Sequence, residues 1–136
     1  MCFGIGPTHA HLTAKQIAAA RAAHPGATVM VHPECPREVR DAADQRLSTG
    51  GMCAYARNSP DTEFIIGTEL GILHRLRKEN PGKNFYPAAN LVCPNMKKTT
   101  LDKVRDCLQD LSPVVTVPED IAVRATRAIA ALLAVV

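Results

Sequence analysis

The chain has 136 residues, a length that fits roughly one domain and is enough to bury a hydrophobic core. Sixteen lysines and arginines against thirteen acidic residues leave a formal net charge of +3, which is too small and too scattered to indicate a nucleic-acid-binding protein. No apolar run reaches the roughly 18 residues of a membrane span. The N-terminus lacks the pattern of a signal peptide, so we expect a cytoplasmic protein.

Helix and strand signals alternate along most of the chain. Thr13 and Gln16 have the spacing of a capping box ahead of an Ala-rich run, and Pro36 suits the first turn of another helix. In chain order we expect a helix over 13–24, a strand over 28–32, a helix over 36–44, a helix over 48–57, a strand over 64–66, a helix over 70–79, a strand over 85–86, an irregular loop over 88–98, a helix over 100–111, an extended segment over 114–117 and a last helix from 118.

Strands that alternate with helices predict a parallel sheet in an α/β layer architecture. In such sheets ligands bind beyond the carboxyl ends of the strands. His32 and Glu34 follow one predicted strand, and Thr68-Glu69 follow the next. Ser48-Thr49 stand at a helix N-terminus, where free backbone N–H groups attract anions. We therefore expect these three polar clusters to share one edge of the sheet.

Each cluster allows two interpretations. His32 and Glu34 could transfer protons, because an imidazole titrates near neutrality and a carboxylate can orient it. They could equally be a solvated strand end, with Glu34 favouring the start of the next helix. Ser48-Thr49-Gly50-Gly51 could hold a phosphate or carboxylate, although it is not a P-loop, or it could simply cap a helix.

The five cysteines, at positions 2, 35, 53, 93 and 107, form no C-x-x-C pair, which argues against a zinc ribbon or finger. Their odd number in a reducing compartment argues against a disulfide framework. We expect Cys53 and Cys107 to be small buried hydrophobic residues. Cys93 lies in a loop ahead of Pro94, where it could be a metal-cluster ligand or an incidental thiol.

Several segments together resemble the C-terminal part of the quinolinate synthases, the A-type enzymes of NAD biosynthesis. The order, spacing and identity of these segments agree through nearly the whole chain. They are Val-His-Pro-Glu-Cys-Pro-Arg-Glu-Val over 31–39, Ala43-Asp44, Ser48-Thr49, Phe-Ile-Ile-Gly-Thr-Glu over 64–69, His74-Arg75-Leu76 and Cys-Pro-Asn-Met-Lys over 93–97.

The resemblance implies a reaction and a fold. The family condenses iminoaspartate with dihydroxyacetone phosphate to give quinolinate, and an aspartate-oxidising enzyme would supply the iminoaspartate. A [4Fe–4S] cluster, held by one cysteine from each of three similar α/β domains around a pseudo-threefold axis, acts as a Lewis acid at its open iron. For this chain we expect a three-layer αβα domain with a short parallel sheet as one part of that fold.

The same resemblance assigns roles to residues. His32 and Glu34 match a pair placed for proton transfer and substrate binding, Ser48 and Thr49 match a pair that holds substrate oxygens, and Cys93 matches the last cluster ligand. The implied domains are a remnant of the preceding domain or linker over 1–13, an α/β domain over 14–96 that carries these residues, and a helical segment over 97–136 that packs back on the other domains.

The chain departs from the family in two respects. The family is about twice as long, so this chain looks like a fragment that lacks the N-terminal domains or self-associates in their place. Gly6 stands where the middle cluster cysteine is expected, and Cys2 could replace it only if the N-terminus folds back. We therefore expect the chain alone to bind a cluster poorly and to have little activity. The alternatives are a cluster-free, non-catalytic remnant or binding module, and an unrelated anion-binding α/β domain.

Overall fold

A computed structural model describes residues 8–135 of the chain. The chain divides into two compact units, Met1–Met96 and Lys97–Val136, which we call the first and the second unit. The expectations for Cys2 and Gly6 concern residues outside the described part of the chain. All buried apolar side chains of the described chain lie between Leu12 and Leu91, so the hydrophobic core belongs to the first unit.

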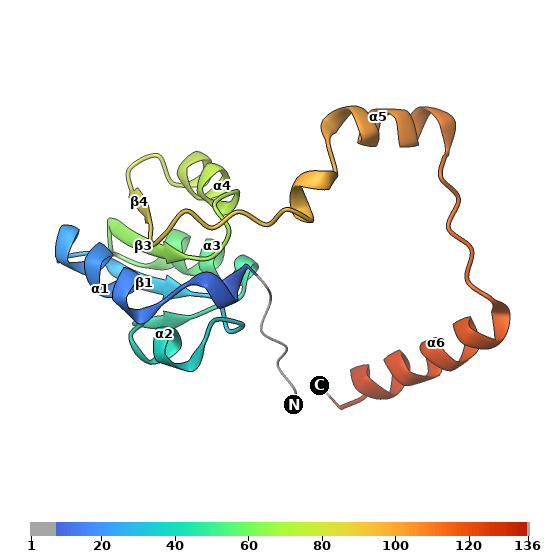
Figure 1. Cartoon of the computed structure of the whole chain (residues 1–136), viewed down its shortest axis with the longest axis horizontal. Coiled ribbons are helices and arrows are strands. Elements are labelled where there is room, and N and C mark those ends of the chain that lie inside the picture. Colours follow the sequence, from blue (N-terminus) through green and yellow to red (C-terminus); the bar gives the residue numbers. More distant parts are fainter. Residues whose placement is uncertain (1–7, 136) are drawn as a thin grey trace. The chain divides into compact units, whose positions relative to one another are not determined.

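The first unit is built around a four-stranded parallel sheet with the strand order β2-β1-β3-β4 (Figure 1). Its elements are the 3₁₀ helix η1 (His9–His11), α1 (Ala14–Ala23), β1 (Thr28–Val31), α2 (Arg37–Asp41), β2 (Gln45–Arg46), α3 (Thr49–Asn58), β3 (Glu63–Gly67), α4 (Ile72–Glu79) and β4 (Asn84–Pro87). Because every neighbouring pair of strands is parallel, all four carboxyl ends lie at one edge of the sheet.

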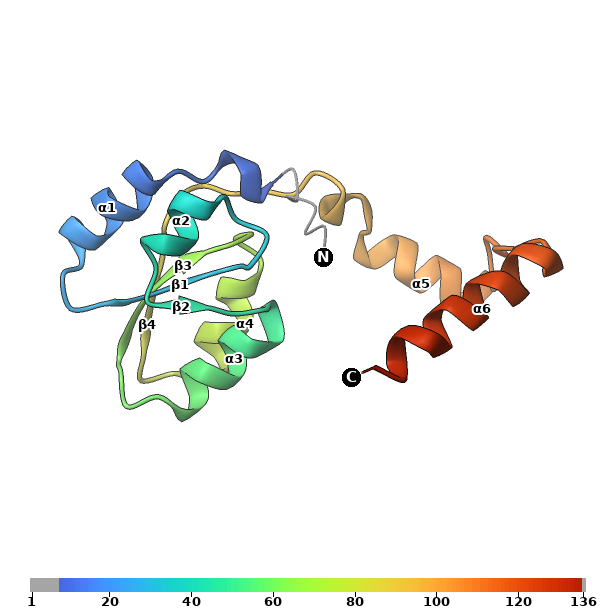
Figure 2. The same ribbon diagram turned by 90° about the horizontal axis from the view of Figure 1, so that it is seen from below.

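Helices cover both faces of this sheet, as the sequence predicts for a three-layer αβα domain (Figure 2). The side chains of successive strand residues point to opposite faces. Val29 and Val31 therefore pack with Ile17 of α1 and Val39 of α2 on one face. On the other face, the neighbouring strand residues pack with α3 and α4; the large members of that cluster are Met30, Met52, Phe64, Ile66, Leu76 and Phe85.

The second helix is shorter than predicted. It ends at Asp41 rather than near Asp44, and the short strand β2 follows, which the sequence did not indicate. The reason is that Asp44 bonds to β1 instead of continuing the helix. Its backbone N–H donates to the Val29 carbonyl, and its carboxylate accepts from the Val29 N–H at 2.8 Å and from Arg21 at 3.1 Å. These partners, Arg21 among them, lower the pKa of Asp44 against the opposing effect of burial.

Close packing fixes the ends of β1 and β3. A Cβ atom added at Gly67 would lie 2.7 Å from Val31 Cγ1 and 3.1 Å from Leu12 Cδ2, so only glycine fits at this position without a shift. The Gly67 carbonyl accepts a hydrogen bond from the His32 N–H at 3.3 Å. The segment around η1 is held here as well, because Leu12 is 1% exposed in the core. The strand ends that carry the predicted polar clusters are therefore rigid.

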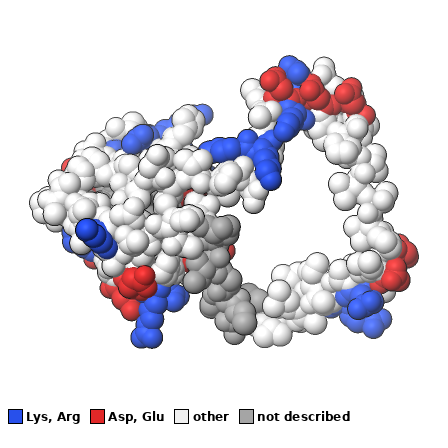
Figure 3. Space-filling view, viewed as in Figure 1, with Lys and Arg blue, Asp and Glu red and all other residues white. Residues whose placement is uncertain are grey.

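The 3₁₀ helix η2 (Met96–Lys98) spans the boundary of the two units in the sequence, and the second unit contains α5 (Leu101–Asp110) and α6 (Glu119–Leu133). Thr100 caps α5 by accepting from the Lys103 N–H, and Glu119-Asp120 place acidic side chains in the first turn of α6. In the space-filling view, acidic side chains gather on α5 (Figure 3). The apolar residues of α5 and its C-cap lie three and four positions apart and are exposed: Leu101, Val104, Leu108 and the C-cap Leu111. Among the described helices, none is both long and apolar enough to cross a membrane.

Candidate functional site

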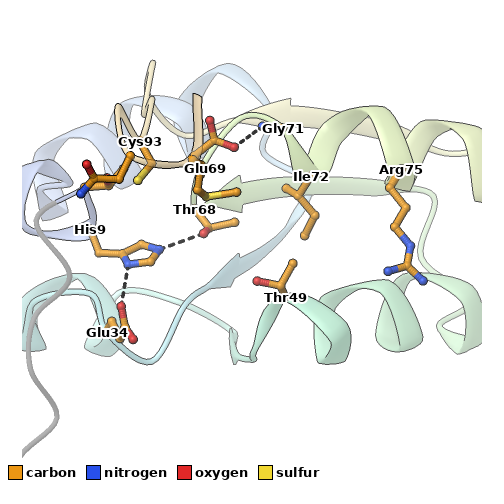
Figure 4. A pocket seen from close by; sticks show the side chains of 12 residues that line it. His9, Glu34, Thr49, Thr68, Glu69, Gly71, Ile72, Arg75 and Cys93 are labelled. Carbon is orange, nitrogen blue, oxygen red and sulfur yellow. Dashed lines mark hydrogen bonds and ion pairs between the residues drawn. The ribbon is translucent and has the colours of Figure 1, made fainter. Parts of the chain in front are cut away.

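A cavity of about 500 Å³ lies at the carboxyl edge of the sheet (Figure 4). Five residues that the sequence singled out line it: Glu34 after β1, Thr49 at the start of α3, Thr68 and Glu69 after β3, and Cys93 in the loop that follows β4. The remaining lining residues are Thr8, His9, Gly71, Ile72, Arg75, Asn95 and Met96. The three polar clusters thus share one site, as the rule for parallel sheets predicts.

His9 connects the two strand ends. Its Nδ1 atom lies 3.2 Å from Glu34 Oε2, and its Nε2 atom lies 2.9 Å from Thr68 Oγ1. The His9 side chain is 13% exposed, while that of Glu34 is 42% exposed and remains open to a ligand. Residues 25 and 59 positions apart in the chain therefore form one hydrogen-bonded row along the wall of the cavity.

His32 stacks on His9, with ring centroids 4.6 Å apart and ring planes 5° from parallel. Its Nδ1 atom accepts a hydrogen bond from the Glu34 N–H at 3.2 Å, so the neutral ring carries its proton on Nε2. Burial lowers the pKa of His32, and the charge of His9 lowers it further against the opposing effect of Glu34. His32 does not itself line the cavity but supports the residue that does.

The structure separates the roles of Ser48 and Thr49. The Ser48 hydroxyl caps α3 by accepting from the Gly51 N–H at 3.2 Å, as the capping interpretation predicts. Thr49, the first residue of the helix, lines the cavity. A hydroxyl can accept one hydrogen bond and donate another. The hydroxyl hydrogen of Ser48 therefore stays available to an oxygen atom of a bound ligand.

Cys93 is half-buried at the wall of the cavity. The backbone N–H of Met96 lowers the pKa of its thiol most, followed by the Thr8 hydroxyl and the Asn95 N–H, while burial and the charge of Glu69 oppose them. A thiolate is the form that ligates metals, so this environment suits a metal ligand. The turn after Cys93 thus supplies the donors that favour ionisation.

The other described cysteines lie away from this site. Cys35 and Cys53 are buried in the core, and burial raises the pKa of Cys35 to about 11. Cys107 is exposed on α5, which shows that its prediction as a buried residue was wrong: that face of the helix has no covering element among the described residues. The described residues therefore offer one thiolate to an iron–sulfur cluster at this site, not three.

Sequence reasoning missed several lining residues. Nothing in the spacing of His9 indicates that η1 returns to the strand ends. Arg75 lines the cavity one turn into α4, and its Nε atom donates to Glu79 Oε1 at 2.6 Å. The i, i+4 spacing of Arg75 and Glu79 predicts that ion pair, but no sequence signal places Arg75 in the cavity that Thr49 lines.

The fold and the site define a class of protein: an α/β domain with a polar, thiol-bearing site at the carboxyl edge of a parallel sheet. The family model described as "Quinolinate synthetase A protein" matches residues 1–134. The chain belongs to this family, as the resemblance of its motifs implied.

Curated relatives agree with this assignment. The chain is 56% identical over 127 residues to a quinolinate synthase of Methanoregula boonei, covering 93% of this chain and 42% of that relative. It is 47% identical over 134 residues to one of Thermodesulfovibrio yellowstonii, covering 98% and 44%. It is 50% identical over 133 residues to one of Geobacter metallireducens, covering 97% and 44%. The chain thus spans less than half the length of these relatives.

Proposed function

We propose that this chain is the C-terminal part of a quinolinate synthase. The whole enzyme condenses iminoaspartate with dihydroxyacetone phosphate to quinolinate in the cytoplasmic synthesis of NAD. The observation that carries the proposal is that Glu34, Thr49 and Cys93, which the motifs assign to the site, line one cavity in a chain of this family. An aspartate-oxidising enzyme is the expected source of the iminoaspartate.

The chemistry of the described residues supports their proposed roles. Glu34, with an accessible carboxylate, accepts a proton from the substrate. His32 stays neutral near pH 7 because its pKa is lowered, so its Nε2–H acts as a hydrogen-bond donor rather than as a base. Ser48 and Thr49 bind substrate phosphate or carboxylate oxygens at the N-terminus of α3, where the helix dipole favours an anion.

Cys93 is the proposed ligand of a [4Fe–4S] cluster, which when bound supplies a Lewis acid to the substrate. The two further thiolates would come from the rest of the enzyme. We also propose that residues 97–136 pack on those missing domains, since apolar side chains of α5 and α6 are exposed in the described chain; Leu101 is 85% exposed and Leu132 is 68% exposed. Association of the chain with itself is the competing arrangement.

The proposal is tested by complementation under anaerobic conditions. The chain is mixed with a polypeptide that covers the part of the Methanoregula boonei relative it does not match, the mixture is reconstituted with iron and sulfide, and quinolinate is measured from the two substrates. We expect the chain alone to hold little iron and to make little quinolinate, and the mixture to gain both.

Three variants separate the roles in this assay. Cys93→Ala should abolish both the iron content and the activity. Glu34→Gln should lower the activity at least about 100-fold and leave the iron content unchanged. Cys107→Ala, an exposed thiol on α5, is the matched control and should change neither quantity. If Cys93→Ala keeps its iron, the ligand assignment is wrong; if the complete mixture binds iron but makes no quinolinate, the proposed activity is wrong.

A further inference from the structure

The imidazole of His9 is held at both of its nitrogen atoms. Glu34 Oε2 lies 3.2 Å from Nδ1, and Thr68 Oγ1 lies 2.9 Å from Nε2 (Figure 4). The ring also stacks on His32, so its plane is fixed as well. A surface histidine would satisfy its nitrogens with water, but this side chain is 13% exposed and takes its partners from the protein.

The chemistry of the two partners fixes the position of the proton. A carboxylate accepts hydrogen bonds and cannot donate, so Nδ1 of His9 must carry the hydrogen that points at Glu34. In the neutral ring Nε2 is then an acceptor, and the Thr68 hydroxyl donates to it. His32 has the opposite arrangement, because its Nδ1 accepts from the Glu34 N–H. The two stacked imidazoles therefore carry their hydrogens on different nitrogens.

We propose that Thr68 is a positioning residue that holds His9 in the Nδ1–H tautomer by donating its hydroxyl hydrogen to the Nε2 lone pair. A hydroxyl suits this task better than an amide or a second carboxylate, because it can donate to the neutral ring and accept from the protonated ring without moving. The ring of His9 thus presents its Nδ1–H to the Glu34 carboxylate in a fixed orientation. The use of this contact in the reaction rests on the proposed function; the tautomer and its dependence on Thr68 do not.

Both ends of this contact stand on rigid structure. Thr68 is 5% exposed and follows Gly67, whose carbonyl accepts from the His32 N–H and which leaves no room for a Cβ atom beside Val31. His9 lies in η1, which is anchored by the buried side chain of Leu12. Thr68 also faces the cavity, so its hydroxyl is near enough to a ligand to respond to one. A residue needed only for packing at this position could be valine.

The test is nitrogen-15 NMR of the whole chain with labelled histidine, at a pH where the imidazoles are neutral. A ring held in one tautomer gives two widely separated nitrogen shifts, and these converge when tautomers mix. His9→Gln assigns the signals of His9. We expect the Nδ1–H pattern for His9 and the Nε2–H pattern for His32. In Thr68→Val the His9 shifts should converge, and in Thr68→Ser they should return to the wild-type values.

Thr28→Val is the matched control, because it removes a hydroxyl that donates to Asp61 at 2.7 Å. Thr28 is the first residue of β1 and lies at the opposite edge of the sheet. It should leave the His9 signals unchanged. An Nε2–H pattern for His9 in the unmodified chain overturns the proposal, even if Thr68→Val fails to fold. Unchanged His9 shifts in a folded Thr68→Val chain also overturn it. Because no substrate or cluster is present, neither result depends on whether the chain contributes to quinolinate synthesis.

Discussion

Two cysteines in the first unit differ sharply in their surroundings although both stand in motifs of the family. Cys93 is half-buried beside backbone N–H donors that lower the pKa of its thiol, while burial raises the pKa of Cys35 to about 11. Only the thiolate reacts with alkylating reagents. The two residues should therefore respond differently to a thiol reagent as pH changes.

We expect iodoacetamide to label Cys93 in the folded chain at a pH below the usual range for a thiol, and Cys35 to stay unlabelled until the chain unfolds. Peptide mass spectrometry across roughly pH 6 to 9 gives the rate at each site. Unfolding in denaturant should make the two rates similar. Labelling of Cys35 as fast as that of Cys93 in the folded chain would contradict the assignment of Cys93 as the reactive thiol.

The sequence said least about where single side chains lie relative to one another. His32, Glu34, Thr49 and Cys93 could be chosen because their types carry chemistry and they follow predicted strands or open a helix. His9 could not be placed, because its contact with Thr68 spans 59 positions and depends on the packing of η1. The exposure of Cys107 could not be foreseen either, since a helical pattern does not say whether a partner covers it.

At the scale of elements, local signals were sufficient for the long helices and the central strands. The capping box of Thr13 and Gln16 forms as its spacing predicts, and the strands β1, β3 and β4 lie where apolar and aromatic clusters indicated. The strand β2 was missed because it has two residues and owes its place to the bonds of Asp44 with Val29. Such a strand is determined by its neighbour and leaves no pattern of its own.

The N-cap of α3 gives a prediction at this scale. Replacing Ser48 with alanine removes the acceptor of the Gly51 N–H and should lower the free energy of unfolding by about 1 kcal/mol. Ser48→Asp keeps an acceptor and should cost much less. Urea denaturation followed by circular dichroism measures both. A loss in Ser48→Asp as large as that in Ser48→Ala would mean that capping is not what Ser48 contributes to stability.

On the scale of the whole molecule, the two units differ in what they bury. The first unit holds every buried apolar side chain of the described residues, whereas the apolar residues of α5 and α6 are exposed. We therefore expect a chain shortened to residues 1–96 to fold and to keep its free energy of unfolding within about 0.5 kcal/mol. Its binding of a hydrophobic dye should fall relative to the full chain.

Denaturation curves and dye fluorescence of the two chains check this expectation. A control chain that retains α5 but ends at residue 117 should show an intermediate dye signal, because it loses the apolar side chains of α6 alone. Failure of the 1–96 chain to fold, or a loss of several kcal/mol, would show that residues 97–136 stabilise the core after all.

The borders of the sheet also bear on how the protein behaves at high concentration. A free edge strand is a template to which a strand of another molecule can add, and long flat edges promote aggregation. Here β2 is two residues long, and β4 ends in Pro87, which has no N–H to donate. Neither border offers a long row of free hydrogen-bonding groups. Polymerisation through β-strand addition should therefore be disfavoured, and any self-association should proceed through helical surfaces instead.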